Sequence, residues 1–271
     1  MSAPDSSITA GERVRAWLIA LGNKAVEAVV LTKIRWRGQP TKFDRWALAA
    51  VHKMMWRQVE RMRREGAAGV TRVASDRGAG VHNSRVVLSV PKPEWRMDAE
   101  QEMARLQNVL GPRAEVHHIG STAIEELPAK PIIDLAAALP APTFREELAR
   151  ARAALGAAGY RYLGVRGGHF FEKGQAGVRT HALQVHAAKS TELGELLRFR
   201  DALRHDPVLR TDYARTKAAL AAHFPRQRLL YVTYKFHWIA EWQWRTGGAA
   251  DWATWFVAHR RALSSMASDA R

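Results

Sequence analysis

Three kinds of hydrophobic spacing divide the chain. Apolar residues recur at helical spacing over Gly11–Leu31, Phe43–Arg64 and Trp95–Leu110, which predicts amphipathic helices. A largely apolar run between two prolines, Ile132–Leu139, is typical of a buried strand, and the alternation over Val178–His186 is typical of a half-buried one. The pattern therefore predicts two helices followed by a mixture of strands and helices, which is an α+β fold.

Shorter strands are expected where β-branched and aromatic residues lie between turn residues. These segments are Val86–Val90, Ala114–Ile119, Tyr160–Leu163 and His169–Glu172. A four-residue turn, Gly174–Gly177, joins the last of these strands to the next one as a hairpin. The predicted sheet thus has about five strands.

Capping residues set the remaining helix boundaries. Thr143 with Glu146 has the spacing of a capping box, Ser190 is a helix N-cap, and Asp206 precedes a proline that suits the first helical position. The expected helices are Phe144–Ala158, Ser190–Arg204, Asp206–Phe224, Leu229–Trp244 and Asp251–Met266.

Charge and composition narrow the classes of partner and chemistry. The net charge is +16, and residues 1–85 hold 16 Lys and Arg against 7 Asp and Glu, a balance of +9. A basic chain favours anionic partners, although an arginine-rich solvated surface explains the same balance. The chain has no cysteine, which excludes disulfides, thiolate zinc sites and cysteine nucleophiles. With no membrane-length apolar run and no secretory signal, we expect a cytoplasmic protein.

The basic N-terminal region, residues 1–84, has three interpretations. Its helix Phe43–Arg64 carries Trp46 and Trp56 beside many arginines, so it suits a nucleic-acid or membrane surface. The same aromatic stripe could pack a helical hairpin onto the main domain. Alternatively, the region is unselected sequence that results from an over-extended start, followed by a Gly-rich linker, Gly66–Asn83.

One stretch carries the most specific chemistry, namely His118–Ala123 followed by Asp134 on the next predicted strand. Gly120 has no Cβ to block a phosphate from a backbone N–H, and Ser121 and Thr122 add hydroxyl donors. A helix beginning after this turn would direct its positive end at an anion. Asp134 could hold Mg²⁺, which takes one or two carboxylates together with substrate phosphates.

A Gly-Ser turn after one strand and an aspartate on the next resembles the nucleotidyltransferase superfamily, and the longer strings resemble its GrpB-like family. The blocks that carry the resemblance are His118–Ala123, Ala129–Asp134, Phe170–Gly174, Arg179–His181, Phe199–Asp201 and Tyr213 with Lys217. The resemblance covers roughly Val86–Arg245. It implies a small mixed nucleotidyltransferase-like sheet with flanking helices over residues 85–245, between the extension 1–84 and a C-terminal helix over 246–271.

The resemblance also implies roles for individual residues. Asp134 would be a catalytic metal ligand for Mg²⁺, although a structural pair with Lys130 or Arg179 is the alternative. Strand alternation places Arg179 and His181 on one face, as an anion clamp and a general base. The expected phosphate-binding residues are Gly120, Ser121, Thr122, Lys130, Arg179 and Arg200, for which the alternatives are a plain turn, a surface lysine and an arginine paired with a neighbouring acid.

The chain departs from the family pattern at several positions. Ala136 stands where the superfamily has a second acid, and Ala182 and Gln184 stand where the family more often has histidines. Glu125-Glu126 replaces a usual Pro-Gly. A second metal ligand would have to come from Glu125, Glu126, Glu172 or Asp201.

The expected function is binding of a nucleotide or another phosphorylated small molecule, with nucleotidyl transfer using Mg²⁺ as the activity that the fold suggests. One alternative is a catalytically silent ligand-binding domain of the same fold, which the missing acid and histidines favour. The other is a nucleic-acid-binding protein that uses the basic N-terminal helices.

Overall fold

The computed structural model describes residues 41–65, 81–82 and 86–247, with a few single residues between 11 and 32 and residue 256. The helices predicted over Gly11–Leu31 and Asp251–Met266 and most of the predicted linker therefore lie outside the described residues. The chain divides into two compact units, which are described separately. One consists of Met1–Arg72 with Asp212–Ala258, and the other of Val73–Thr211 with His259–Arg271.

The unit that begins at Val73 is built on a mixed β-sheet, as the sequence predicts. In the described residues its strand order is β2-β3-β6-β5-β4, and β1 also pairs with β6. The strands β3 and β6 are parallel, and the other pairs are antiparallel. The strands are β1 (Val81–His82), β2 (Glu115–Ile119), β3 (Ile133–Leu139), β4 (Tyr160–Val165), β5 (His169–Gln175) and β6 (Val178–Ala187).

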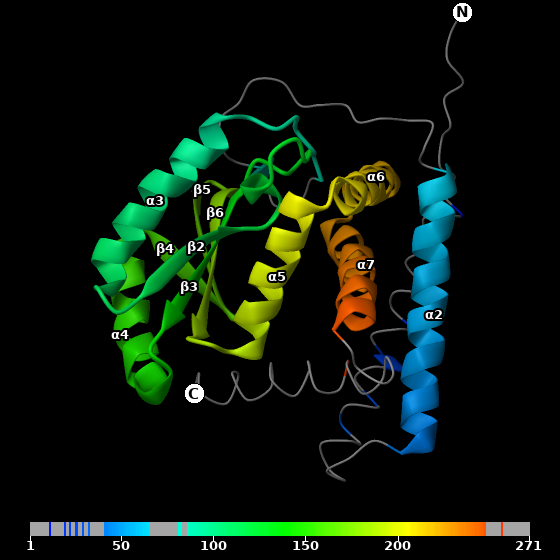
Figure 1. Ribbon diagram of the computed structural model, residues 1–271, viewed down its shortest axis with the longest axis horizontal. Helices are drawn as coiled ribbons and strands as arrows, with labels where there is room; N and C mark the ends of the chain where they lie inside the picture. The colour runs from blue at the N-terminus through cyan, green and yellow to red at the C-terminus, as the bar shows by residue number, and fades with distance from the viewer. Residues whose placement is uncertain are drawn as a thin grey trace, which may run out of the picture. The chain divides into compact units, whose positions relative to one another are not determined.

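Helices cover both faces of this sheet (Figure 1). Helices α3 (Glu94–Leu110) and α4 (Phe144–Ala157) pack on one face, and α5 (Thr191–His205) packs on the other, against β2 and β6. Two short 3₁₀ turns, η2 (Ser121–Ala123) and η3 (Ala141–Thr143), lie beside the ends of β2 and β3. The α+β class predicted from the hydrophobic pattern is confirmed.

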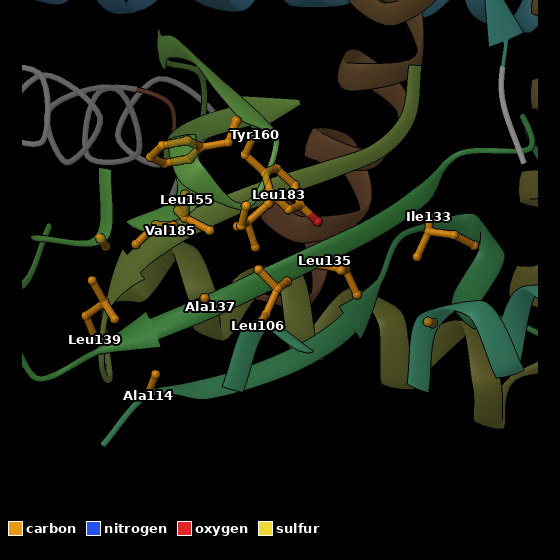
Figure 2. Close-up of a cluster of buried hydrophobic side chains, with 14 of the residues drawn as sticks. Leu106, Ala114, Ile133, Leu135, Ala137, Leu139, Leu155, Tyr160, Leu183 and Val185 are labelled. Carbon is orange, nitrogen blue, oxygen red and sulfur yellow. The ribbon is translucent and has the colours of Figure 1, made fainter. Parts of the chain in front are cut away.

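Strand β3 divides the core between the two faces by simple alternation. Its odd-numbered residues, including Leu135, lie with Leu106 of α3 and Leu155 of α4 in one hydrophobic cluster (Figure 2). Its even-numbered Ala136 and Ala138 lie with Leu193 of α5 in another. Burial on both faces explains why this segment is apolar in the sequence at every position except Asp134.

Two local predictions are wrong. The segment Val86–Val90 forms one bridge, Ser89 with Ala129, instead of a strand, because Pro91 follows it directly and the pairing stops after these two backbone hydrogen bonds. Thr143 forms no capping box: it ends the η3 turn, and its side chain accepts no cap hydrogen bond from the helix that follows.

Two other predicted caps are confirmed. Ser190 Oγ accepts a hydrogen bond from the Leu193 N–H at 3.4 Å. Asp206 Oδ1 accepts from the N–H groups of Val208 and Leu209, both at 2.9 Å, and Pro207 begins the next helix. The Ser190 cap fixes the start of α5, which carries the arginines of the candidate site, and the Asp206 cap fixes the start of α6.

The other unit is helical in its described part. It contains α2 (Lys42–Glu65), α7 (Arg228–Thr246) and, from Asp212 onward, α6 (Pro207–His223). Helix α2 packs against α7. Its buried face consists of Ala47, Leu48, Val51, His52, Met55, Val59 and Met62.

Polar contacts add to the packing of α2. A reciprocal cap begins this helix, in which Thr41 N donates to Asp44 Oδ2 at 2.9 Å and Asp44 N donates to Thr41 Oγ1 at 3.2 Å. Further along, buried His52 contacts the carboxylate of Glu241 and lies 3.3 Å from His237, measured between the two Nδ1 atoms.

Within the residues that are described, every helix is too short or too polar to span a lipid bilayer.

Candidate functional site

The candidate site lies where β2 ends beside the start of β3. Ile119 pairs with Asp134 across the two strands, so the turn that follows Ile119 begins next to the aspartate. Paired residues point to the same face of a sheet, and on this row Asp134 also pairs with Ala182 of β6. The side chain of Asp134 therefore lies on the face of the sheet that α5 covers.

Gly120 is in direct contact with this aspartate. A Cβ added to Gly120 would lie 2.6 Å from Asp134 Oδ2 and 2.8 Å from Asp134 Cβ. Its backbone angles, φ 70° and ψ −166°, belong to a region that is essentially restricted to glycine. Sequence reasoning selected Gly120 for phosphate access, and the structure adds a second requirement: only glycine leaves room for the Asp134 side chain.

The turn after Gly120 is shorter than the sequence predicts. The expected helix is the single 3₁₀ turn η2, closed by hydrogen bonds from Ala123 N to Gly120 O and from Ile124 N to Ser121 O. So short a turn provides no helix dipole at its start, and that part of the prediction is wrong. The N–H groups of Ser121 and Thr122 are not used in the hydrogen bonds that close the turn.

The hydroxyl of Thr122 points into the protein. Thr122 is buried, and its Oγ1 lies 3.0 Å from His118 Nε2 and 3.4 Å from the carbonyl oxygen of Ile132. Ser121 is only half-buried. Of the two hydroxyls that the sequence suggests as phosphate donors, that of Ser121 is the one placed at the surface of the turn.

Two arginines of α5 hold the backbone around the turn. Arg200 Nη1 donates to the carbonyl oxygen of His118 at 3.3 Å, and its Nε donates to the carboxylate of Asp201 at 2.8 Å. One helical turn later, Arg204 Nε donates to the carbonyl oxygen of Ala123 at 3.1 Å. Sequence reasoning missed Arg204, although its spacing of four residues from Arg200 on one helix was the available signal.

These arginines make the surroundings of the turn electropositive. The pKa of His118 is lowered to about 4, first by burial and then by the charges of Arg204 and Arg200. The pKa of His117 is also lowered, again by burial and then by Arg200. The field that disfavours a proton on these imidazoles favours an anion near the turn.

Arg179 and His181 lie on opposite faces of the sheet, which corrects the predicted clamp. A bulge interrupts the alternation, because Lys173 pairs with His181 whereas its neighbour Gly174 pairs with Arg179, and Thr180 is the extra residue. His181 therefore points to the same face as Ile133, with which it pairs, and away from Asp134. A bulge has no clear signature in the hydrophobic pattern.

Arg179 also forms a buried ion pair with Glu172. It is 6% exposed, its Nε donates to Glu172 Oε2 at 2.7 Å, and its guanidinium lies over the ring of Phe170. On the opposite face, His181 Nδ1 lies 2.9 Å from Thr180 Oγ1. Burial lowers the pKa of His181, against the raising effect of Glu102. This geometry separates His181 from any reaction at Asp134.

Acidic side chains that might complete a metal site are mostly engaged with arginines. Glu172 pairs with Arg161 and Arg179, Asp201 with Arg200, and Glu126 with Arg210 at 3.4 Å. Across the described residues, no group of three His, Asp or Glu side chains is placed to hold a metal ion. A Mg²⁺ ion held by Asp134 would therefore need to take most of its other ligands from phosphate and water.

Ala136, which stands where the superfamily has its second acid, is packed in the core. Ala136 is fully buried in the cluster that includes Ile119 and Leu193, under α5. Lys130 lies half-buried just before β3, in a turn closed by the hydrogen bond from Ile132 N to Lys130 O at 2.7 Å. The structure thus brings Gly120, Ser121 and Asp134 together with two arginines nearby.

A family model described as GrpB protein matches residues 85–245. The chain belongs to the GrpB family. Every residue of the candidate site falls within this match, whereas α2 lies outside it. The turn, the aspartate and the sheet around them therefore lie in the part of the chain that the GrpB family covers, and the superfamily resemblance noted from the sequence is consistent with this membership.

Curated relatives share this region at moderate identity. The chain is 31% identical over 156 residues to the UPF0157 protein YqkA of Bacillus subtilis, a match that covers 57% of this chain and 45% of that protein. It is 34% identical over 161 residues to the UPF0157 protein BH1888 of Halalkalibacterium halodurans, covering 57% of this chain and 78% of the relative. The match thus spans less than half of YqkA and most of BH1888.

A solved structure has the same fold. The crystal structure of the conserved protein GrpB from Enterococcus faecalis superposes with a TM-score of 0.52 at 27% sequence identity. The superposition covers 66% of this chain and 98% of that one. The GrpB fold is therefore shared along nearly the whole of the smaller protein.

Proposed function

We propose that this GrpB-family protein binds a nucleotide or another phosphorylated small molecule at the turn after β2, together with Mg²⁺ at Asp134. The observation that carries the proposal is the contact of the Asp134 carboxylate with Gly120, on a turn that two arginines of α5 support. The carboxylate of Asp134 would hold a cation, and the N–H groups of Ser121 and Thr122, which do not close the turn, would donate to a phosphate.

Each residue has a distinct task in this proposal. The N–H groups of Ser121 and Thr122 and the hydroxyl of Ser121 donate hydrogen bonds to phosphate oxygens. Arg200 and Arg204 keep the turn in place through the carbonyl oxygens of His118 and Ala123, and their charges attract the anion. Thr122 contributes through its backbone, because its hydroxyl faces His118.

The donor set around Asp134 fits Mg²⁺ only when a phosphate is present. Asp134 would hold the ion, which when bound would neutralise phosphate charge and polarise a phosphoryl oxygen. A single carboxylate gives weak affinity for Mg²⁺ by itself. We therefore expect the ion and the phosphorylated ligand to bind more tightly together than separately.

Nucleotidyl transfer is the second candidate, and the position of Asp134 beside a Gly-Ser turn favours it by analogy with the superfamily. The packing of Ala136 under α5 favours a binding protein without turnover, because transfer generally uses two metals held by two or three carboxylates. Release of pyrophosphate from a nucleoside triphosphate would distinguish the two candidates.

The test is thermal unfolding of the full chain with a panel of nucleoside triphosphates and sugar phosphates, each with and without Mg²⁺. A ligand at about 100 times its dissociation constant adds about 2.7 kcal/mol to the free energy of unfolding. Asp134→Asn preserves the shape beside Gly120 but removes the charge, so it should abolish the Mg²⁺-dependent part of the stabilisation.

The matched control is Glu146→Gln, which removes one exposed carboxylate from α4. This variant should respond to ligand and Mg²⁺ as the wild-type protein does. If Asp134→Asn keeps the full Mg²⁺-dependent stabilisation, the role of Asp134 is wrong. If no phosphorylated compound stabilises the wild-type protein, the proposed function is wrong.

A further inference from the structure

Helix α2 presents one continuous basic face to solvent. Trp46, Lys53, Arg57 and Arg64 follow one another at intervals of seven, four and seven residues, so they line up on one side of an α-helix. All four side chains are exposed. The opposite side, which includes Leu48 and Met55, is buried. We call the exposed side the α2 basic face, which comprises Lys42, Phe43, Trp46, Lys53, Arg57 and Arg64.

The cations of this face are not neutralised by nearby acids. Among the residues that the structure describes, Lys42, Lys53, Arg57 and Arg64 form no ion pair. The two acids of α2 whose contacts are described are engaged elsewhere: Asp44 caps the helix and Glu60 binds Arg63. The field of the four cations is therefore directed at solvent, along about 30 Å of helix axis.

Two aromatic rings stand at the N-terminal end of the same face. Phe43 is 66% exposed and Trp46 is 65% exposed, and their ring centroids are 5.7 Å apart. Single exposed rings are common on protein surfaces, but these two rings lie together and form an apolar patch beside the cations. A row of cations that ends in exposed rings is the combination that holds single-stranded nucleic acid, where cations follow the phosphates and bases stack on aromatic side chains.

We propose that the α2 basic face binds single-stranded nucleic acid, with the phosphates along Lys53, Arg57 and Arg64 and unpaired bases on Trp46 and Phe43. A single strand is favoured over a duplex because exposed rings can stack on unpaired bases, whereas duplex bases already stack on one another. A membrane surface fits less well, because the apolar side of α2 is buried in its own unit and cannot enter lipid. This inference is independent of the site at Asp134.

The test measures binding of the full chain to a fluorescent oligothymidine at several salt concentrations. Lys53→Gln, Arg57→Gln and Arg64→Gln combined should reduce the slope of log affinity against log salt by about 2, which is about 100-fold in affinity at 0.1 M salt. Trp46→Ala should weaken binding about tenfold and leave the salt slope unchanged, because stacking releases no counterion.

The matched control removes three other exposed cations, Arg96, Arg145 and Arg150 of α3 and α4, by replacement with glutamine. It has the same net charge as the triple variant of α2 but leaves the α2 basic face intact. It should therefore bind oligothymidine nearly as the wild-type protein does. Equal loss in both triple variants would show that total charge is responsible and would overturn the assignment to α2. Absence of oligothymidine binding, with or without binding to phosphatidylserine vesicles, would also overturn it.

Discussion

At the scale of single residues, Gly120 is the position where one added methyl group would do most to the candidate site. We predict that Gly120→Ala lowers the free energy of unfolding by about 3 kcal/mol, because its φ of 70° is unfavourable for alanine and the new Cβ would overlap Asp134. Urea denaturation followed by circular dichroism measures this loss.

Gly111 provides a control for the backbone part of this cost. Its angles, φ 89° and ψ 172°, lie in the same region, and a Cβ added there would meet nothing within 4 Å. Gly111→Ala should therefore cost only the backbone strain. If the two variants lose the same stability, the contact between Gly120 and Asp134 has no energetic role and the site is more open than the structure indicates.

Some residues of the site could be predicted from the sequence and others could not. The residue types in His118–Ala123 and Asp134 were sufficient to select the turn and the aspartate. Their direct contact depends on the pairing of Ile119 with Asp134, which is a matter of strand register and is not encoded in spacing alone. Arg204 was missed because a helical arginine has many surface roles, and only the fold places it beside Ala123.

At the scale of elements, hydrophobic period and capping residues predicted most of the fold. The period identifies α3, whose apolar side is buried, and β3, which is buried on both faces. Ser190 and Asp206 mark helix starts correctly. The failures have separate causes, and at Val86–Val90 the proline that follows the segment limits the pairing to a single bridge. The bulge at Thr180 moves the residues of β6 that precede it to the opposite face of the sheet from the one that strict alternation predicts. Arg179 and His181 therefore do not share a face, and the predicted clamp does not form.

The hairpin of β5 and β6 also turns more tightly than predicted. Its connection has two residues, Ala176 and Gly177, with φ of 49° and 75°. Positive φ at both positions is the conformation of a type I′ turn, for which Asn-Gly is preferred over Ala-Gly. The predicted four-residue turn fails because β5 continues to Gln175 before the chain reverses.

We predict that Ala176→Asn stabilises this hairpin by about 0.5–1 kcal/mol, because asparagine tolerates left-handed backbone better than alanine. Thermal or urea unfolding measures the gain. Gln175→Asn, at the neighbouring strand position, should give no gain. Equal effects of the two variants would show that added polarity, not backbone conformation, is responsible.

At the scale of the whole molecule, several buried groups make stability depend on pH in the same direction. Hydrogen bonds from arginines hold the pKa of Glu172 below its usual value even though burial alone would raise it. Hydrogen bonds from His52 and Arg245 do the same for Glu241 in the other unit. These carboxylates stabilise the folded protein above their ordinary pKa, and that stabilisation is lost as pH falls through their lowered values.

Histidines add a second window at higher pH. Burial and the neighbouring His169 lower the pKa of His186 to about 4, and His118 is lowered to about 4 by burial and two arginines. Between about pH 6.5 and 4 the unfolded chain binds protons at these positions and the folded chain does not, so stability falls as pH falls. The histidines therefore act before the carboxylates during acidification.

His186 allows this account to be tested, because it is 0% exposed and, within the described residues, neither ring nitrogen has a hydrogen-bond partner. His186→Leu replaces the titrating ring with an apolar side chain of similar volume. From the lowered pKa, the wild-type protein should lose about 2 kcal/mol at this residue between pH 7 and pH 5, and the variant should lack that loss. Urea denaturation at a series of pH values gives both curves. Parallel curves for the two proteins would contradict this account. They would mean that His186 is protonated as readily in the folded state as in the unfolded one, through a hydrogen-bond partner or solvent access that the observed packing does not provide.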